Sequence, residues 1–404
     1  MSILDNLFSE DKWNEFLLYK EEKGHMPKKE YEKLKLFIEN KEYISYSQKV
    51  IDGTFEPIPQ LKMINKKSNG KKRQVFVFDE NENFMFKFLS YLLGDLDYLF
   101  NKNLYSFRRQ KSVKNAIYKL ASVKDIHKMY SYKVDIKDYF NSASTKVMCN
   151  ILDEKINDKP LLSFFKKILL DTRCYKNSQQ IHINRGLMAG VSISSFFANL
   201  YLSELDCYFY ENSINYIRYS DDIIVFAKEK DEVLKYENII KEHLKTKGLC
   251  VNESKEVLTL PYEKWEFLGF SYENGKIDIS KVSKDKLKAK MKRKAKALLR
   301  WKNKNNASYK RALRAFIITF NKKLYNNPIH NDITWARWYF PIINTDKSLK
   351  EIDKYYVECL RFIYTGRYSK SNYNLTYDEI KSLGFKSLVN TYYKEQTLID
   401  KKSQ

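Results

Sequence analysis

The spacing of hydrophobic residues predicts that the chain begins with helices. Within residues 1–50, Trp13, Phe16 and Leu17 are followed by further apolar residues at near-helical spacing, which is typical of amphipathic helices. The run FMFKFLSYLLGDLDYLF (84–100) is apolar almost throughout, so we expect a buried helix there. Helices are therefore predicted within residues 1–50 and at 84–100.

The middle third has a different pattern, in which short apolar strands alternate with helices. YKVDI (132–136) is typical of a strand. An earlier strand, QVFVF (74–78), is predicted in the first third, where Asn69-Gly70 before it is a strong signal for a hairpin turn. INYIRYSDDIIVFAK (214–228) consists of two apolar runs broken by Ser-Asp-Asp, which predicts a hairpin. Residues 185–210 predict a loop that leads into a long helix. This alternation predicts an α+β fold.

A basic helix is expected over residues 281–305. The segment holds twelve Lys or Arg and a single acid, Asp285, while Leu287, Met291 and Ala295 keep one apolar face. The whole chain of 404 residues carries a formal net charge of +23. A solvated helix face is one interpretation of such a run. The other is that a polyanion such as nucleic acid or a membrane surface neutralises it.

Several function classes are excluded by composition. No stretch approaches the length of a membrane span. The five cysteines include no CxxC pair and the five histidines do not cluster, so we expect reduced thiols and no zinc site. Only 11 glycines occur, without a common phosphate-loop motif. The first residues carry no basic region followed by an apolar run, and we expect no secretory signal.

Three carboxylates are the leading candidates for chemistry. Asp135 ends a predicted strand, and Asp221-Asp222 lies at the tip of the predicted hairpin. Adjacent buried acids repel each other, and Mg²⁺, which binds carboxylates together with substrate phosphates, relieves that repulsion. Taken alone, Asp221-Asp222 is also compatible with a solvated turn, and Asp135 with a surface acid at a strand end.

Five short motifs resemble those of reverse transcriptases in their order and spacing. They are VDIKDYF (134–140), GLMAGVSISSFFANLYL (186–202), YSDD (219–222), NESK (252–255) and FLGF (267–270). Upstream, NGKKRQVFVF (69–78) and YSFRRQKSVKNAI (105–117) are similar to two fingers motifs of the same family. The resemblance covers about residues 65–300.

The resemblance implies an α+β right-hand polymerase fold, with fingers, a palm built on an antiparallel sheet, and a mostly helical thumb. Helical extensions would flank it at both ends. The expected boundaries are 1–50 for the N-terminal extension, 51–130 and 149–185 for the fingers, 131–148 and 186–275 for the palm, 276–365 for the basic thumb, and 366–404 for the C-terminal extension.

The resemblance also assigns roles in catalysis. Asp135, Asp221, Asp222 and the main-chain carbonyl of Ile136 would hold two Mg²⁺ ions, with Mn²⁺ as a substitute. Two such ions activate the attacking hydroxyl and stabilise the leaving pyrophosphate. Lys255 would protonate that pyrophosphate, although a solvated lysine is the plainer interpretation.

Nucleotide contacts follow from the same motifs. Lys71 or Lys72 and Arg73 would bind the triphosphate, for which a planar guanidinium is well suited. Phe140 would act as a steric gate against the ribose 2′-hydroxyl, and it also suits a core position. Gly186 and Gly190 would let the backbone approach nucleotide and template closely. Asn199 matches a motif residue, with helix packing as an equal alternative.

Nucleic-acid contacts are expected in the last third of the chain. Phe267 and Gly269 would form a primer grip, and Lys288, Lys292 and Lys296 would contact the backbone of the nucleic acid. The leading hypothesis is an RNA-directed DNA polymerase that binds dNTPs and an RNA template and makes a DNA product. The alternatives are a template-independent DNA nucleotidyltransferase and an RNA-binding scaffold with a vestigial palm.

The subfamily is suggested by the absence of motifs typical of other subfamilies and by the C-terminal residues 334–394. Ala189 and Ser195 depart from the group II intron pattern, and the Val-Thr-Gly of retron enzymes is missing. Residues 334–394 resemble the tail of defence-associated, abortive-infection-like bacterial reverse transcriptases. That resemblance implies antiphage defence, a cognate noncoding RNA as template, cytoplasmic action without a membrane, and homo-oligomerisation as an option.

Overall fold

A computed structural model describes residues 2–23, 26–65, 72–325, 334–367 and 374–402 of the chain. The chain divides into two compact units, Met1–Glu263 and Lys264–Gln404, each of which is described by itself. Within the described residues, no helix is long and apolar enough to cross a membrane.

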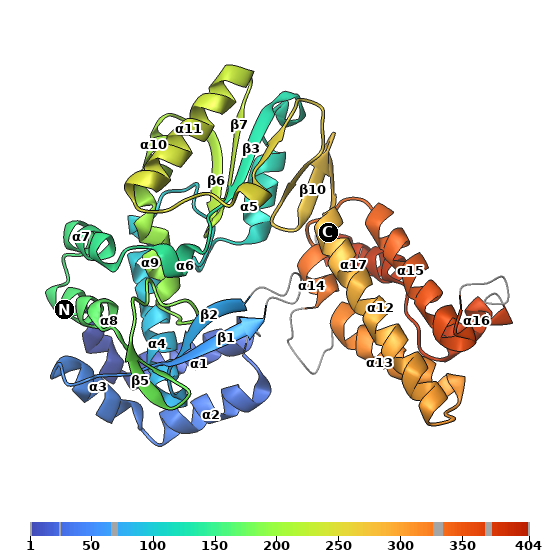
Figure 1. The fold of residues 1–404 in the computed structure, drawn as a ribbon, viewed down its shortest axis with the longest axis horizontal. Coiled ribbons are helices and arrows are strands. Elements are labelled where there is room, and N and C mark those ends of the chain that lie inside the picture. The colour runs from blue at the N-terminus through green and yellow to red at the C-terminus, as the bar shows by residue number, and fades with distance from the viewer. Residues whose placement is uncertain (1, 24–25, 66–71, 326–333, 368–373, 403–404) are drawn as a thin grey trace. The chain divides into compact units, whose positions relative to one another are not determined.

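The central sheet of the N-terminal unit has the strand order β6-β7-β3-β8. It contains β3 (Tyr130–Asp135), β6 (Asn215–Tyr219), β7 (Asp222–Ala227) and β8 (Val257–Thr259), all paired antiparallel. β7 is apolar at consecutive positions because both of its faces are buried. Helices α10 (Ser203–Glu211) and α11 (Lys230–Thr246) pack on this sheet (Figure 1).

A second sheet and the remaining helices complete the N-terminal unit. The second sheet has the order β2-β1-β4-β5, where β1 (Gln60–Asn65) pairs antiparallel with β2 (Lys72–Val77). The other elements of the unit are β4 (Arg173–Lys176), β5 (Gln179–His182), α1 (Glu10–Lys23), α2 (Lys28–Glu39), α3 (Tyr43–Ile51), α4 (Glu80–Leu92), α5 (Val113–Ala121), α6 (Tyr139–Ser142), α7 (Thr145–Lys155), α8 (Lys159–Leu170) and α9 (Ser194–Tyr201), with 3₁₀ helices at Ile3–Phe8, Leu93–Leu99, Ile126–Lys128 and Glu253–Lys255.

The N-terminal helices share one hydrophobic core with the rest of this unit. Trp13 is fully buried, and its ring stacks on Phe88 of α4 with a centroid separation of 3.8 Å. Its indole Nε1 donates a hydrogen bond to the carbonyl oxygen of Leu7 at 3.0 Å, which satisfies the polar atom that burial removes from water. Residues 1–50 are therefore anchored to α4.

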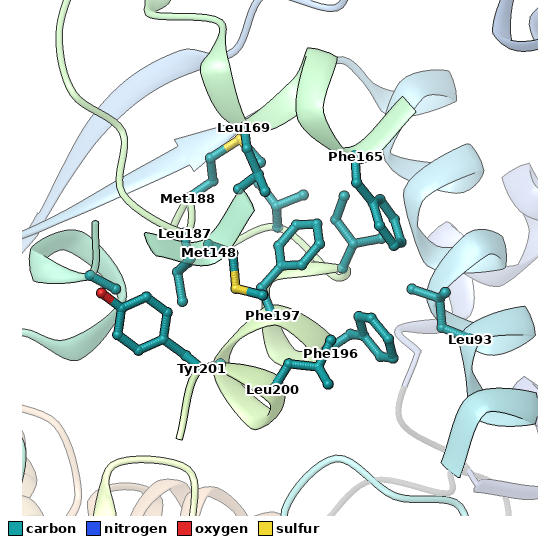
Figure 2. Close-up of a cluster of buried hydrophobic side chains, with 14 of the residues drawn as sticks. Leu93, Met148, Phe165, Leu169, Leu187, Met188, Phe196, Phe197, Leu200 and Tyr201 are labelled. Carbon is teal, nitrogen blue, oxygen red and sulfur yellow. The ribbon is translucent and has the colours of Figure 1, made fainter. Parts of the chain in front are cut away.

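A cluster of aromatic and aliphatic side chains holds α9 against α8 and the loop before α9. Figure 2 shows Phe165 of α8 facing Phe197 of α9, and their rings meet edge to face at 4.9 Å. Leu187 and Met188 of the preceding loop are fully buried in the same cluster. This packing fixes the loop that carries Gly186 and Gly190.

The C-terminal unit combines a small sheet with helices. Its antiparallel sheet has the order β11-β10-β9. The core face of its longest helix, α12, is made by Leu287, Met291 and Ala295, with Leu298 on the following turn. The elements of this unit are β9 (Trp265–Phe267), β10 (Phe270–Glu273), β11 (Lys276–Ile279), α12 (Lys281–Lys304), α13 (Tyr309–Leu324), α14 (Trp335–Tyr339), α15 (Lys347–Thr365), α16 (Tyr377–Ser382) and α17 (Leu388–Lys402).

The predicted α+β class is confirmed, including the hairpin at 214–228 and the basic helix after residue 281. Two helices are shorter than expected. The run 84–100 is α-helical to Leu92 and then continues as a 3₁₀ helix, and the helix after residue 194 breaks at Leu202. The predicted turn Asn69-Gly70 lies outside the described residues. The predicted boundaries of fingers, palm and thumb stay predictions.

Candidate active site

The pairing of β3 with β7 brings the predicted carboxylates together. In this register Asp135 lies directly across from Asp222. One residue further, the amide of Ile136 donates a hydrogen bond to the carbonyl oxygen of Asp221 at 3.0 Å. The three acids, which come from segments 86 residues apart in the sequence (221 − 135), therefore meet at one end of a strand pair.

Burial and mutual repulsion disfavour the charged forms of two of these acids. The pKa of Asp222 is raised to about 7, first by burial and then by the charges of Asp221 and Asp135. The pKa of Asp221 is also raised, again first by burial and then by Asp135. Lys255 and Arg73 oppose this shift at Asp221. The site therefore has a negative charge that its surroundings only partly neutralise.

Asp135 is held by the segment 250–255, which runs beside the end of β3. The amide of Asn252 donates to the main-chain oxygen of Asp135 at 2.7 Å, and its side-chain Nδ2 donates to Oδ2 at 3.0 Å. The Lys255 ammonium lies 2.5 Å from the other carboxylate oxygen, Oδ1. Both oxygens of Asp135 thus have a partner, and the predicted Lys255 is placed at the carboxylates.

The loop before α9 packs against the segment that follows β3 and against β2. Gly186 has a φ of +54°, and a Cβ there would lie 2.4 Å from the carbonyl oxygen of Phe140, so only glycine fits. Gly190 has a φ of +103°, and a Cβ would lie 3.0 Å from the carbonyl oxygen of Phe76 on β2. Both glycines thus permit close contacts within the protein's own backbone, and their approach to nucleotide and template stays a prediction.

Arg73 of β2 and Phe140 of α6 lie close to each other beside the site. Arg73 is exposed, and its Cζ is 6.0 Å from the centroid of the Phe140 ring. Its charge opposes the rise in the pKa of Asp221. Phe140 is half-buried and packs against the core on one side, so it is part of the core and part of the site wall. Lys71 lies outside the described residues, and the neighbouring Lys72 is exposed on β2.

The donor set fits magnesium only together with substrate oxygens. Among the described residues, no group of three or more His, Cys, Asp or Glu side chains forms a ready-made metal cage. Mg²⁺ typically takes one or two carboxylates and completes its six-fold shell with water and phosphate oxygens. Asp221 and Asp222 supply hard oxygen ligands whose repulsion a cation would relieve. The residues present therefore fit a hard divalent cation whose remaining ligands come from outside the protein.

A buried polar network lies directly behind the hairpin tip. Arg218 of β6 is fully buried and forms an ion pair with the buried Asp206 of α10. Its guanidinium also donates to the main-chain oxygen of Ser220, the residue before Asp221, at 3.2 Å. Asn199, predicted from its motif, is buried in the same network, where it bonds Ser106. Its role here is in packing, since 1% of its surface is exposed.

The remaining predicted residues belong to the C-terminal unit. Phe267 is buried, and Gly269 has a φ of +89° in the turn between β9 and β10. Lys292 and Lys296 of α12 are exposed to solvent. Lys288 is different, because its ammonium pairs with Glu351 of α15 and lies 5.5 Å from the centroid of the Tyr355 ring. Lys288 therefore joins α12 to α15.

Sequence reasoning missed Asn252, Arg218 and Asp206. Asn252 opens the NESK motif, so it could have been found beside Lys255. Arg218 lies between Ile217 and Tyr219 in a strand predicted to be buried, where a charged residue needs a partner. That need was a usable signal for Arg218, but nothing local to it identified Asp206, which lies 12 residues earlier on a helix.

Comparison with known proteins gives one family match. Residues 64–272, slightly more than half of the chain, match the family described as reverse transcriptase (RNA-dependent DNA polymerase). The Retron Ec86 reverse transcriptase of Escherichia coli is 24% identical over 39% of this chain and 47% of its own length. A putative COX1/OXI3 intron 2 protein of Saccharomyces cerevisiae is 21% identical over 48% of this chain and 29% of its own length. The matches thus span about half or less of these relatives.

Two solved telomerase structures overlay on the chain at low similarity. Telomerase from Candida albicans, in complex with a fragment of telomeric RNA, covers 89% of this chain and 71% of its own, at 14% identity and a TM-score of 0.45. Apo telomerase from Candida tropicalis covers 86% and 64%, at 14% identity and a TM-score of 0.46. TM-scores below 0.5 support no functional conclusion.

Replacing Asp222 with Asn is expected to stabilise the metal-free protein at pH 8. Because the folded-state pKa of Asp222 is about 7, the folded protein holds a proton that the unfolded chain has already lost, and stability falls as pH rises from about 4 to 7. Asp222→Asn removes that loss, so its Tm should exceed that of the wild type by about 2 °C or more at pH 8.

The same two proteins should differ little at pH 4, where Asp222 is mostly protonated in the folded state. Differential scanning calorimetry without metal at both pH values measures the effect. Glu22→Gln, which removes an exposed carboxylate on α1, is the matched control and should shift Tm at neither pH. An equal Tm difference at both pH values would refute the electrostatic explanation.

Proposed function

The chain belongs to the reverse transcriptase (RNA-dependent DNA polymerase) family, and from this premise we propose that it copies RNA into DNA by adding dNTPs to a primer. The observation that carries the proposal is the meeting of Asp135, Asp221 and Asp222 at one end of β3 and β7. An RNA-binding scaffold has no need of three clustered acids when burial, and then their mutual repulsion, raises the pKa values of two of them.

We propose that the three carboxylates hold Mg²⁺ when nucleotide is bound. Two bound ions would supply the positive charge that activates the primer hydroxyl and stabilises the leaving pyrophosphate. Asp221 and Asp222 offer the oxygens, and the main chain around Ile136 and Asp221 keeps them next to Asp135. The carbonyl of Ile136 is the proposed additional ligand. Mn²⁺ would fit the same oxygen ligands.

Basic side chains at the rim of the site would handle the triphosphate. Arg73 is exposed and close enough to Asp221 to affect its pKa, so its guanidinium can bind a phosphate that the metal ions also contact. Lys255 holds its ammonium at Asp135 through a side chain that is 57% exposed, which leaves it free to turn toward a departing pyrophosphate. These placements support the roles that the motifs imply.

A basic cavity in the N-terminal unit offers a path for the template strand. It measures about 460 Å³ and its lining includes Tyr219, two residues before Asp221. Five cations line it against one acid, Asp97, and they are Lys20, Lys87, Arg108, Arg109 and Lys111. Exposed aromatic surface is present at Phe107, whose ring is 6.4 Å from that of Tyr219. Cations and aromatic rings together suit a single strand.

Lys20 is one of two cations in this cavity, with Lys111, that form no salt bridge among the described residues, and the pKa of each is lowered, first by burial. Lys87, Arg108 and Arg109 already pair with carboxylates. Among the described residues, no salt bridge involves Lys20, and its pKa is lowered by burial and by the charge of Lys87. An anion bound there would offset both effects. Lys20 belongs to α1, which lies before the part of the chain that matches the family.

The exposed face of α12 is a second proposed nucleic-acid contact. Lys292 and Lys296 are exposed, together with Lys286, Lys290 and Arg293. Lys288 contributes less than its sequence position indicates, since it shares the carboxylate of Glu351 with Lys284. We propose that this face holds the backbone of the nucleic acid, as the charge run predicts.

We further propose a role in antiphage defence, with a cognate noncoding RNA as template and action in the cytoplasm. The support is the resemblance of residues 334–394 to defence-associated enzymes and the match to a retron reverse transcriptase. Sequencing the RNA and DNA that co-purify with the protein from its own cells tests this. A single RNA species with complementary DNA would support the proposal, and unrelated mixed RNA would contradict it.

DNA synthesis by purified protein on a primed RNA template tests the central proposal. We expect extension by dNTPs that requires Mg²⁺ and follows the template sequence when dNTPs are supplied one at a time. Asp221→Asn removes a charge at nearly constant shape, so it should reduce the rate by at least 10³-fold while the protein stays folded. Asp231→Asn, an exposed acid on α11, is the matched control.

The outcomes separate the alternatives. Extension that ignores the template sequence would replace the proposal with a template-independent nucleotidyltransferase. RNA binding without any DNA synthesis, unchanged in Asp221→Asn, would replace it with a scaffold.

Removing the Phe140 ring is expected to admit ribonucleotides. The ring borders the site beside Arg73, where it would collide with a 2′-hydroxyl, so Phe140→Ala should lower the preference for dNTP over rNTP by at least 10-fold. Comparison of kcat/KM for dGTP and GTP measures the change. Tyr98→Ala, at an exposed aromatic residue of the same unit, should keep wild-type selectivity. Unchanged selectivity in Phe140→Ala would discard the gate.

Reversing the charge of Lys20 is expected to weaken binding of single-stranded RNA by about 10-fold at 0.1 M salt. The salt dependence should also flatten, because one phosphate contact contributes a slope of about −0.7 for a single strand. Fluorescence anisotropy with a labelled RNA over a series of salt concentrations measures both. Lys12→Glu serves as the control, because Lys12 lies on the same helix and pairs with Glu15 at the surface. Equal effects of the two substitutions would exclude the cavity as the RNA path.

A further inference from the structure

Arg218 and Asp206 form a completely buried ion pair that no step of the proposed chemistry uses. Arg218 has no exposed surface and Asp206 is 1% exposed. The Arg218 Nε donates to Asp206 Oδ1 at 2.8 Å, and a terminal nitrogen of the guanidinium donates to Oδ2, so the pair is two-pronged. Tyr216 donates its hydroxyl to the same Oδ1 at 3.0 Å.

The guanidinium of Arg218 also binds the main chain of the hairpin tip and that of α9. It donates to the carbonyl oxygen of Ser220 at 3.2 Å and to that of Asn199 on α9 at 2.8 Å. A rigid planar fork is required to reach a carboxylate and these two carbonyls at once. The pair thereby connects β6 to α9 and α10.

Ser220 is fixed from its other side by Ser106. The amide of Ser220 donates to the hydroxyl of Ser106 at 2.9 Å, and that hydroxyl donates to the side-chain oxygen of Asn199 at 2.9 Å. Both main-chain polar groups of Ser220 are thus held by buried side chains. Ser220 has a φ of +61°, a conformation that a non-glycine residue adopts only where its surroundings impose it.

Folding stability does not explain this arrangement. Desolvation of a buried ion pair offsets most of its attraction, and apolar residues of similar volume are often as stable or more stable in its place. The position of the network does offer an explanation. Ser220 immediately precedes Asp221, whose own carbonyl oxygen accepts from Ile136 beside Asp135.

We propose that Arg218 and Asp206 are positioning residues that hold the turn Ser220–Asp222 so that its two carboxylates face Asp135. The proposal rests on the proposed function for its rate measurements. A shift of about 1 Å in a reacting group lowers a rate by about 100-fold, so a small relaxation of the turn suffices to impair catalysis. The pair acts through main-chain atoms and does not touch substrate.

Arg218→Lys is the first variant of the test, because it keeps the charge and loses the fork. We expect kcat for dNTP incorporation to fall at least 30-fold while the KM for dNTP changes less than 3-fold. Isothermal titration calorimetry should show at least 5-fold weaker binding of Mn²⁺. This measurement does not depend on polymerase activity. Ile240→Val, a buried truncation in α11, controls for lost stability alone.

The double variant Arg218→Met with Asp206→Leu separates stability from positioning. It replaces the pair by apolar side chains, so its Tm should stay within about 5 °C of the wild type, yet it should lose at least 30-fold in kcat. If it fails to fold, Arg218→Lys alone decides the question.

Wild-type kcat and wild-type Mn²⁺ affinity in Arg218→Lys would overturn the proposal. So would a loss in Arg218→Lys that only follows its lost folded fraction, as expected for Ile240→Val. If the wild type itself made no DNA, the proposed function would fail, and the comparison of Mn²⁺ affinities would still decide whether the pair positions the carboxylates.

Discussion

The antiparallel pairing of β3 with β7 is the constraint on which the rest of the site depends. Side chains on a strand pair are fixed by register, and a slip of one residue would turn each acid to the opposite face. The register places Asp135 opposite Asp222, and the bond from Ile136 to Asp221 extends it by one residue. The other groups of the site, from Asn252 to Arg73, are arranged around that end of the sheet.

Electrostatics explains why so basic a chain concentrates acids at one point. With a formal net charge of +23, the protein attracts polyanions. A metal cation binds only where the local charge is negative. Burial and repulsion raise the pKa values of Asp221 and Asp222, so the folded protein stores an unfavourable interaction at the site. The fully buried Arg218 stays behind the hairpin, where Asp206 neutralises it.

Much of the site could be predicted from the sequence, because its residues lie in short, locally ordered motifs. Asp135 and Asp221-Asp222 were recognisable from a strand end and a broken apolar hairpin, and Lys255 from its motif. Longer-range partners were harder to find. Lys288 and Glu351 pair across two helices although they are 63 residues apart in the sequence, and a charge pattern does not indicate which cations already pair with an acid. The participation of α1 in the main core depends on the stacking of Trp13 on Phe88, which periodicity does not show.

The central claim is that Asp135, Asp221 and Asp222 bind the metal ions of a nucleotide-adding enzyme. Crystals grown with Mn²⁺ and a non-hydrolysable dNTP analogue, measured at the manganese absorption edge, test this most directly. The account predicts anomalous peaks within coordination distance of these carboxylates and of the triphosphate. Ordered nucleotide with manganese bound elsewhere, or with none at these acids, would contradict it.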